Sequence, residues 1–556
     1  MLSIQGHVAF GVWSILAVLG YNFALATDSR NLQSAPSRPH IIMIVMDDLG
    51  SRDLGMHGSE ILTPTCDELA QEGIYLDNYY VLPSCSPTRA ALLSGRYPLH
   101  TGIHTWIEAE STAHLPLDEE TVAQVLQRAN YTTHAVGKWH VGHSSWNQTP
   151  TFRGFESFFG YYMGSEDYFA HNLPWRLNST FKSLYDLRLD FREFCGANCS
   201  QFIDDRGKYS TNIFTRRAID VINRHAQSKE EKPLFLYLAY QAVHSPDEVP
   251  HMYRDAYLDK NWTNKRTIYA GMLTAADEGI ANVTQALKDS GLWNNTLIIF
   301  TTDNGGPTQV CGVQGSSNFP RRGGKCTVWE GGTTGDGFIS GPALSTVAGM
   351  VGNRRMEDIF HVVDWLPTLA ELVGVQPNGK VLDGVSQLSG LRGFNLPPAR
   401  REVFVGYAQA NSLWFGPAIR RNRWKLIQGA SGGPYDQSNL GIPAGQGKNK
   451  FVTGNQTGII YPNGPNLGGS LIPQPGGVSN ATYLLFDLLT DRDETQNVAD
   501  LYPEFVQLLR DRLVEYQKTY VPPQLNTDRA CPFTGFVDSR IVGPAWYVNQ
   551  LVLVGF

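Results

Sequence analysis

The stretch HIIMIVMDDLG, residues 40–50, decides the fold class of this chain of 556 residues. Its apolar run is typical of a buried β-strand, and it ends in Asp47 and Asp48, which begin a polar turn. Three other segments have the same form: YTTHAVGKWHVGH at 131–143, PLFLYLAYQAVHSP at 233–246 and TLIIFTTDNGG at 296–306. Helical patterns lie at 117–129, 210–226 and 269–291. The alternation predicts an α/β fold with a large, mostly parallel sheet covered by helices on both faces.

Each of the four predicted strands brings polar residues to its carboxyl end, where ligands bind in open α/β sheets. These residues are Asp47, Asp48, Lys138, His140, His244, Asp303 and Asn304. Taken alone, the two adjacent aspartates are typical of a turn or a helix cap. Together with Asp303 and Asn304, they would form an all-oxygen cluster, which suits Ca²⁺ or Mg²⁺ rather than zinc. The pattern therefore favours an active site at this edge of the sheet.

A second informative stretch is CSPTRAALLSGRYPLHTG, residues 85–102. Pro87 suits the first turn of a helix, so the sequence predicts a helix that begins near Cys85. Free amides at such an end bind anions, and the fork of Arg89 fits a tetrahedral oxyanion. Lys138, Lys325 and the two histidines could add further donors, as sulfate or phosphate transfer requires. The residues alone leave two roles open for Cys85: a thiolate nucleophile, or a small buried cysteine at a helix cap.

Length and charge limit the class of protein. A chain of 556 residues is expected to contain more than one domain, and its formal net charge of −7 argues against a nucleic-acid binder. After about residue 400, short strand patterns, Gly/Pro/Asn-rich loops and one amphipathic helix pattern at 501–520 follow one another. We predict a main domain over 38–400 and a smaller α+β domain with an antiparallel sheet over 401–556. A long loop excursion is expected at 429–480.

The N-terminus predicts entry into the secretory pathway. Residues 1–26 carry no charged side chain, and an apolar stretch precedes the small-residue pattern Ala24-Leu25-Ala26. We interpret them as a signal peptide cleaved after Ala26, with an uncleaved signal anchor as the alternative. No later segment is long and apolar enough to predict a stable membrane span. Nine Asn-x-Ser/Thr sites fit the same route. They are Asn130, Asn147, Asn178, Asn198, Asn261, Asn282, Asn294, Asn455 and Asn480.

Seven cysteines in an oxidising compartment are expected to form disulfides, and an odd number leaves at least one unpaired. Proximity in the sequence favours bridges between Cys195 and Cys199 and between Cys311 and Cys326. The remaining connectivity cannot be deduced from the sequence.

With these residues in view, the chain resembles the sulfatase family. CSPTRAALLSGR resembles its signature Cys-x-Pro-x-Arg with a downstream Gly-Arg, and NYTTHAVGKWHVG resembles its second signature, which ends in Gly-Lys-Trp-His. Further similar segments extend over nearly the whole mature chain, and within the family they are most similar to the arylsulfatase B group, the N-acetylgalactosamine-4-sulfatases. The resemblance implies an alkaline-phosphatase-like fold, a large mixed sheet flanked by helices, with a smaller C-terminal domain.

The resemblance also changes the expected role of Cys85. It implies that a separate formylglycine-generating enzyme oxidises this cysteine in the endoplasmic reticulum to formylglycine, whose hydrate supplies the nucleophilic hydroxyl. This would explain why Cys85 is the unpaired cysteine. One Ca²⁺ ion would be held by the modified Cys85 together with Asp47, Asp48, Asp303 and Asn304.

The same resemblance implies roles for the remaining site residues. Arg89 would hold the formylglycine and metal side in place, and Lys138 and Lys325 would bind sulfate oxygens. His244 would protonate the leaving alcohol, and His140 would help to remove a hydroxyl proton so that sulfate is expelled. The expected substrates are aryl sulfates and sulfated sugars, including N-acetylgalactosamine 4-sulfate in glycosaminoglycans, and the expected location is lysosomal or secreted.

One departure concerns the segment WEGGTTGDG, in which Thr334 stands where the family usually has an arginine. Loss of that arginine could alter stability or substrate choice.

Two other functions stay open on the sequence alone. A phosphatase or phosphonate hydrolase could use the same scaffold, although such relatives often use Thr or Ser with zinc. A non-catalytic secreted glycan-binding protein is the third hypothesis.

Overall fold

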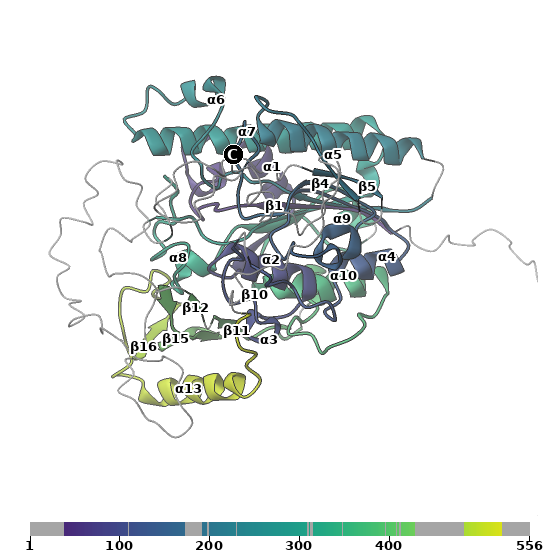
Figure 1. Ribbon diagram of the computed structural model, residues 1–556. Coiled ribbons are helices and arrows are strands. Elements are labelled where there is room, and N and C mark those ends of the chain that lie inside the picture. The colour runs from purple at the N-terminus through teal and green to yellow at the C-terminus, as the bar shows by residue number, and fades with distance from the viewer. Residues whose placement is uncertain are drawn as a thin grey trace, which may run out of the picture. The chain divides into compact units, whose positions relative to one another are not determined.

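The computed structural model describes residues 38–524 apart from 109–110, 173–191, 197–198, 229–230, 309–310, 312–314, 347, 395, 407, 411–412 and 429–482. Its main feature is a ten-stranded sheet in the order β10-β2-β9-β8-β1-β7-β3-β4-β5-β6 (Figure 1). In that order the strands are Arg354–His361, Ile74–Tyr80, Gly337–Ser340, Thr296–Thr302, His40–Met46, Leu234–Ala239, Thr132–Lys138, Ser157–Tyr161, Arg192–Gly196 and Cys199–Phe202.

The four strands expected from the sequence are all present and lie side by side as β8, β1, β7 and β3. They are parallel to one another, with Ile44 of β1 level with Leu238 of β7 and Phe300 of β8. The sheet as a whole is mixed, because β9 runs antiparallel between β2 and β8, and β5 and β6 form an antiparallel edge. The parallel block is therefore central, and all four of its carboxyl ends meet at one edge.

Strand β1 separates two hydrophobic cores, because successive side chains of a strand point to opposite faces. Ile41, Met43 and Val45 face one core, and Ile42, Ile44 and Met46 face the other. Every one of these side chains is almost completely buried, as expected of a parallel strand covered on both faces.

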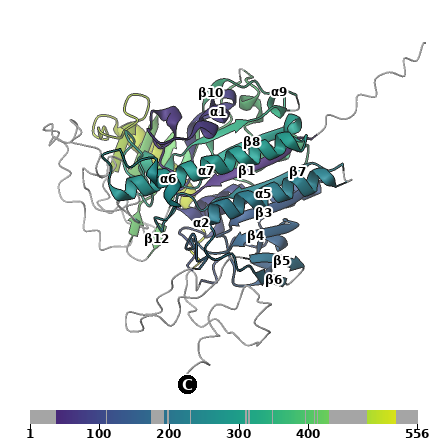
Figure 2. The ribbon, with the colours of Figure 1, turned by 90° about the horizontal axis from the view of Figure 1, so that it is seen from above.

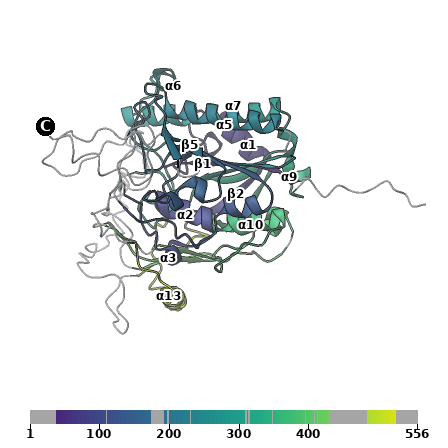
Figure 3. The same cartoon turned by 45° about the vertical axis from the view of Figure 1, so that its right-hand side comes forward.

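Helix α7 contacts α1 and α5 over the second core, and α2, α4 and α10 contact one another over the first (Figures 2 and 3). The first group spans Pro64–Glu72, Ser210–Gln227 and Asn264–Asp289. The second spans Cys85–Ser94, Val122–Arg128 and Trp365–Val373. Short helices are α3 (Pro98–Thr101), α6 (His251–Asp255), α8 (Glu330–Thr333), α9 (Ala343–Thr346) and α11 (Leu388–Leu391). Helices therefore cover both faces, as the sequence predicts.

The C-terminal part forms a four-stranded antiparallel sheet in the order β11-β14-β15-β16. These strands span Glu402–Val405, Ala418–Arg421, Trp424–Gln428 and Tyr483–Asp487; helix α13 spans Pro503–Gln517, and the hairpin β12-β13 spans Ala408–Ala410 and Leu413–Phe415. The predicted antiparallel sheet and amphipathic helix are confirmed. Leu426 of β15 and Leu513 of α13 belong to the same hydrophobic core as Val45 of β1, so the small sheet packs on the large one.

Some sequence predictions fall outside the described residues: the signal peptide at 1–26 and the whole of the excursion at 429–480. The side chains of Cys195 and Cys199 also lie outside them. Among the described helices, none has the length and apolarity needed to cross a bilayer.

Candidate active site

The carboxyl ends of the four central strands bring the predicted site residues together. Asp47 and Asp48 follow β1, Lys138 ends β3, His244 follows β7, and Asp303 and Asn304 follow β8. Helix α2 begins at Cys85, as its sequence predicts, and adds Arg89 one turn later. The predicted cation Lys325 reaches the same site from the loop before α8.

Arg89 is the completely buried link between α2 and the strand ends. Its Nε and Nη2 atoms donate to Oδ2 of Asp303 at 3.0 and 2.8 Å, and Nη2 lies 3.5 Å from Oδ2 of Asp47. Its Nη1 also donates to the backbone carbonyl of Lys138 at 3.4 Å. One guanidinium therefore ties α2 to β1, β3 and β8.

Two lysines balance the two aspartates that follow β1. Lys138 forms an ion pair with Oδ2 of Asp47, and Nζ of Lys325 lies 2.7 and 2.9 Å from the two carboxylate oxygens of Asp48. Burial alone would raise the pKa of each carboxyl, but the adjacent ammonium group and the other nearby cations lower it below its usual value. With Arg89 beside Asp303, three carboxylates thus face three cations in a buried site.

The thiol of Cys85 lies among these charges. Its Sγ is 3.7 Å from Oδ1 of Asp47, and the residue is 2% exposed. Burial raises the pKa of the thiol to about 12, even though Lys138 and Lys325 act in the opposite direction. An unmodified Cys85 in this setting is a protonated thiol at neutral pH.

The two histidines are held by backbone carbonyls in defined orientations. Nε2 of His140 lies 3.0 Å from the carbonyl of Ile107, which can only accept, so Nε2 carries the proton and Nδ1 the lone pair. In His244, Nδ1 lies 2.7 Å from the carbonyl of Ser245, and Nε2 faces Asp48 at 3.7 Å. Burial and neighbouring cations lower the pKa of both imidazoles.

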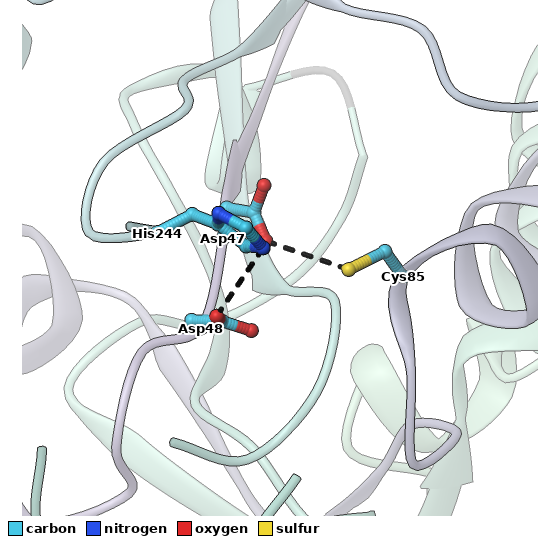
Figure 4. A group of neighbouring side chains, drawn as sticks. All are labelled: Asp47, Asp48, Cys85 and His244. Atoms are coloured by element: carbon cyan, nitrogen blue, oxygen red, sulfur yellow. Dashed lines mark hydrogen bonds and ion pairs between the residues drawn. The ribbon is translucent and has the colours of Figure 1, made fainter. Parts of the chain in front are cut away.

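Four of these groups form a candidate metal site (Figure 4). One ligand atom from each of Asp47, Asp48, Cys85 and His244 lies within 4.8 Å of the others. Asn304 adds an oxygen: its Nδ2 donates to Oδ1 of Asp48 at 2.6 Å, while its Oδ1 is buried without a hydrogen-bond partner. A buried orphan acceptor beside carboxylates is what a hard cation would satisfy, so the donor set fits such an ion. Asp303 is not in the group of four, and its carboxylate binds Arg89.

The cysteines partly confirm the sequence predictions. Cys311 and Cys326 form the expected disulfide, with their Cα atoms 6.2 Å apart, next to Lys325. Cys85 is unpaired, but so is the buried Cys66, so the odd number of cysteines does not single out Cys85. Thr334, at the position of the expected arginine, is buried; its hydroxyl donates to the carbonyl of Glu330 at 2.5 Å, and its backbone bridges to Tyr80.

Three supporting groups escape sequence reasoning. The amide of Ile107 donates to Oγ of Ser86 at 3.0 Å, and its carbonyl orients His140, so one residue contacts both Ser86, next to Cys85, and His140. Tyr168 donates its hydroxyl to the carbonyl of His244 at 2.8 Å. No sequence signal identifies these contacts, because two of them are made by backbone atoms far along the chain from the side chains they orient.

The comparisons with known proteins agree with the geometry. The Sulfatase family profile matches residues 39–375. Arylsulfatase J of Mus musculus is 37% identical over 507 residues, covering 87% of this chain and 77% of that protein. N-acetylgalactosamine-6-sulfatase of Canis lupus familiaris is 28% identical over 546 residues, covering 93% and 94% of the two chains.

Solved structures share the fold. The complex of Ps i-CgsB with k-i-k-neocarrahexaose is 25% identical, with a TM-score of 0.67 and coverage of 87% of this chain and 94% of that one. Phosphonate monoester hydrolase of Agrobacterium radiobacter is 18% identical with a TM-score of 0.55 over 91% and 99% of the chains, which shows a common fold alone. The expected alkaline-phosphatase-like architecture is confirmed. With its site at the strand ends and a family match over more than half of its length, the chain belongs to the sulfatase family of sulfuric ester hydrolases.

Proposed function

We propose that this sulfatase hydrolyses aryl sulfates and sulfate esters of N-acetylgalactosamine in glycosaminoglycans, with a nucleophile formed from Cys85. The observation that carries the proposal is the position of Cys85 at the start of α2, with Asp47 3.7 Å away and the ammonium groups of Lys138 and Lys325 on the neighbouring carboxylates. An anionic group that reacts at Cys85 would meet cations on both sides. Catalysis of sulfate transfer depends mainly on such positioning and charge stabilisation.

Two groups complete this site in the proposal. Calcium, bound by Asp47, Asp48, Asp303, Asn304 and modified Cys85, would polarise the sulfate ester and favour ionisation of the attacking hydroxyl. Formylglycine at position 85, in its hydrated form, would supply that hydroxyl. The carboxylate oxygens of the site and the buried Oδ1 of Asn304, which has no hydrogen-bond partner, support the choice of a hard cation, because such ions prefer oxygen ligands.

The chain's own side chains then divide the work. Arg89 holds the start of α2 against Asp303, and Lys138 and Lys325 bind sulfate oxygens. Nδ1 of His244 donates to a carbonyl, so Nε2 points toward the site and carries the lone pair of the neutral ring. In the proposal, Nε2 protonates the leaving alcohol when the ring is the imidazolium. His140 keeps a lone pair on Nδ1 because Nε2 is held by Ile107, which suits an acceptor for the hydroxyl proton.

The substrate class rests on similarity. The matched proteins include N-acetylgalactosamine-6-sulfatases from several mammals, and the chain motifs resemble the 4-sulfatases. We favour the 4-sulfate as the substrate and treat the 6-sulfate as the competing outcome. The secretory route, with a lysosomal or extracellular location and a formylglycine-generating enzyme as maturation partner, is supported by the leader pattern and by the Cys311–Cys326 disulfide.

The reaction class is tested with nitrophenyl sulfate and nitrophenyl phosphate. We expect wild-type protein to have a higher kcat/KM for the sulfate, and we expect Cys85→Ala to lose at least about 10³-fold of that value because the nucleophile is gone. Cys66→Ala is the matched control, since Cys66 is also buried and unpaired but lies outside the site. Preference for the phosphate, or full activity of Cys85→Ala, would contradict the proposal.

The substrate is tested with defined disaccharides that carry one sulfate at position 4 or 6 of N-acetylgalactosamine. We expect release of sulfate from the 4-sulfate at a higher kcat/KM than from the 6-sulfate, measured by ion chromatography. The reverse order would assign the 6-sulfate, and hydrolysis of neither, with nitrophenyl sulfate still turned over, would remove N-acetylgalactosamine from the proposal.

The modification is tested by mass spectrometry of protein secreted from eukaryotic cells. We expect the peptide that contains position 85 to carry an aldehyde or its hydrate, and the peptide that contains Cys66 to carry an ordinary thiol. Cys66 thus serves as an internal control for nonspecific oxidation. Active protein in which position 85 is entirely a thiol would refute the formylglycine route.

The metal is tested by thermal unfolding with and without calcium. Because binding to the folded state stabilises it, calcium at about 100 times its dissociation constant should add about 2.7 kcal/mol and raise the melting temperature. Asn304→Leu should reduce this shift, whereas Asp220→Asn, which changes an exposed acid on α5, should leave it unchanged. An equal calcium shift in both variants would exclude Asn304 from the metal site.

A further inference from the structure

A buried cluster of charges lies where the small sheet meets the large one. Lys425 of β15 places its ammonium 2.9 Å from Oε1 of Glu330 and 2.8 Å from Oε1 of Glu494. The other carboxylate oxygen of Glu494 accepts from the backbone amide of Glu330 at 2.6 Å. Lys425 is 1% exposed, Glu330 5% and Glu494 0%, so water does not screen these charges.

Groups from four further positions complete the cluster. Tyr80, the last residue of β2, donates its hydroxyl to Oε2 of Glu330 at 2.7 Å, and Arg420 of β14 donates to that hydroxyl at 2.5 Å. Arg322 donates to the backbone carbonyl of Glu494 at 3.0 Å. Thr334 donates to the carbonyl of Glu330. The charged side chains that act on the carboxylate of Glu494 are therefore Lys425 and Glu330, whereas Arg420 acts on Glu330.

The cluster is joined to the active site through the segment from Lys325 to Thr334. The amide of Lys325 donates to the carbonyl of Gly306 at 3.2 Å, and that of Gly305 donates to Gly332 at 3.2 Å. The amide of Cys326 donates to the carbonyl of Pro83 at 2.7 Å. The segment is thus bonded to the loop that carries Asp303 and Asn304 and to the residues just before Cys85. Glu330 is its anchor on the small sheet.

Two carboxylates share one ammonium in this cluster, so its charge state depends on pH. Burial raises the pKa of Glu494 to about 7, because the attraction of Lys425 does not offset burial and the repulsion from Glu330. Lys425 and Arg420 instead lower the pKa of Glu330 against the effect of burial. A folded-state pKa above the unfolded value means that the proton on Glu494 stabilises the fold at low pH. That contribution is lost as the pH rises from about 4.5 to about 7.

We propose that Glu330, Lys425 and Glu494 are positioning residues that hold Lys325 on the sulfate-binding side of the site, and that this hold is tighter in acid. The part that concerns sulfate binding rests on the proposed function. In acid, a neutral Glu494 leaves one Glu330–Lys425 ion pair. Above neutrality the second buried carboxylate is charged, competes with Glu330 for Lys425 and loosens the anchor of the Lys325 segment.

The first test uses Glu494→Gln, which keeps the shape and a carbonyl acceptor for the amide of Glu330 but removes the charge. Melting temperatures are measured between about pH 5 and about pH 8, together with KM for nitrophenyl sulfate. We expect the melting temperature of the wild type to fall relative to that of the variant as the pH rises, and its KM to rise relative to that of the variant. Parallel curves for both proteins in both measurements would overturn the proposal.

The second test uses Lys425→Met, which removes the ammonium group that pairs with Glu330 and Glu494. We expect KM for nitrophenyl sulfate to rise by about tenfold or more, equivalent to about 1.4 kcal/mol of binding, with a smaller change in kcat. Arg423→Gln is the matched control, because Arg423 lies two residues away and its ion pair with Asp487 is exposed. A folded Lys425→Met protein with unchanged KM would overturn the positioning role.

The two tests separate this inference from the proposed function. If Lys425→Met does not fold, the pH comparison of Glu494→Gln decides the matter alone. If the wild type does not hydrolyse sulfate esters at all, the proposed function fails, and the difference in melting temperature between wild type and Glu494→Gln across pH still supports or overturns the charged cluster.

Discussion

The ion pair between Arg89 and Asp303 is the interaction on which the site depends. Four parallel strands end at one edge of the sheet, and three carboxylates gather there without water to screen them. Buried carboxylates repel one another strongly. Breaking a buried ion pair such as Arg89–Asp303 costs about 3–5 kcal/mol. Arg89 reduces the repulsion from inside α2. Because Cys85 begins the same helix, the contact that neutralises Asp303 also fixes the position of Cys85.

The other two cations of the site, Lys138 and Lys325, are held less rigidly than Arg89. A guanidinium held by Asp303, Asp47 and a backbone carbonyl has little freedom, whereas the ammonium groups of Lys138 and Lys325 are point charges on flexible stems. A divalent ion on Asp47 and Asp48 would compete with the two lysines for the same oxygens. Arg89 is thus a structural cation, whereas Lys138 and Lys325 are the cations that we propose to bind sulfate.

Much of this arrangement was predictable from local sequence. The apolar runs that end in polar residues predicted β1, β3, β7 and β8, and Pro87 predicted the start of α2, because strand burial and helix entry leave local patterns. The order of the strands, the antiparallel β9 and the Ile107 carbonyl were not predictable, since long-range pairing has no local signature. The Glu330–Lys425–Glu494 cluster was missed for the same reason: its members come from distant segments. From the odd number of cysteines, the sequence suggested that Cys85 is the unpaired one. The structure shows that Cys66 is unpaired as well, so a count of cysteines cannot identify the reactive residue.

The small sheet shares a hydrophobic core and a buried charged cluster with the rest of the described chain. The described residues from Arg38 onward cluster as one compact unit, and the boundary near residue 400 stays a prediction from the sequence. Leu426 and Leu513 share a core with Val45 of the central strand, and Lys425 supplies the only side-chain ammonium within ion-pairing distance of Glu330 among the described residues. Without β15, Glu330, a buried carboxylate five residues from Lys325, would lose its ion pair with Lys425. The small sheet therefore holds, through Glu330, the segment that carries Lys325, the lysine that we propose to bind sulfate.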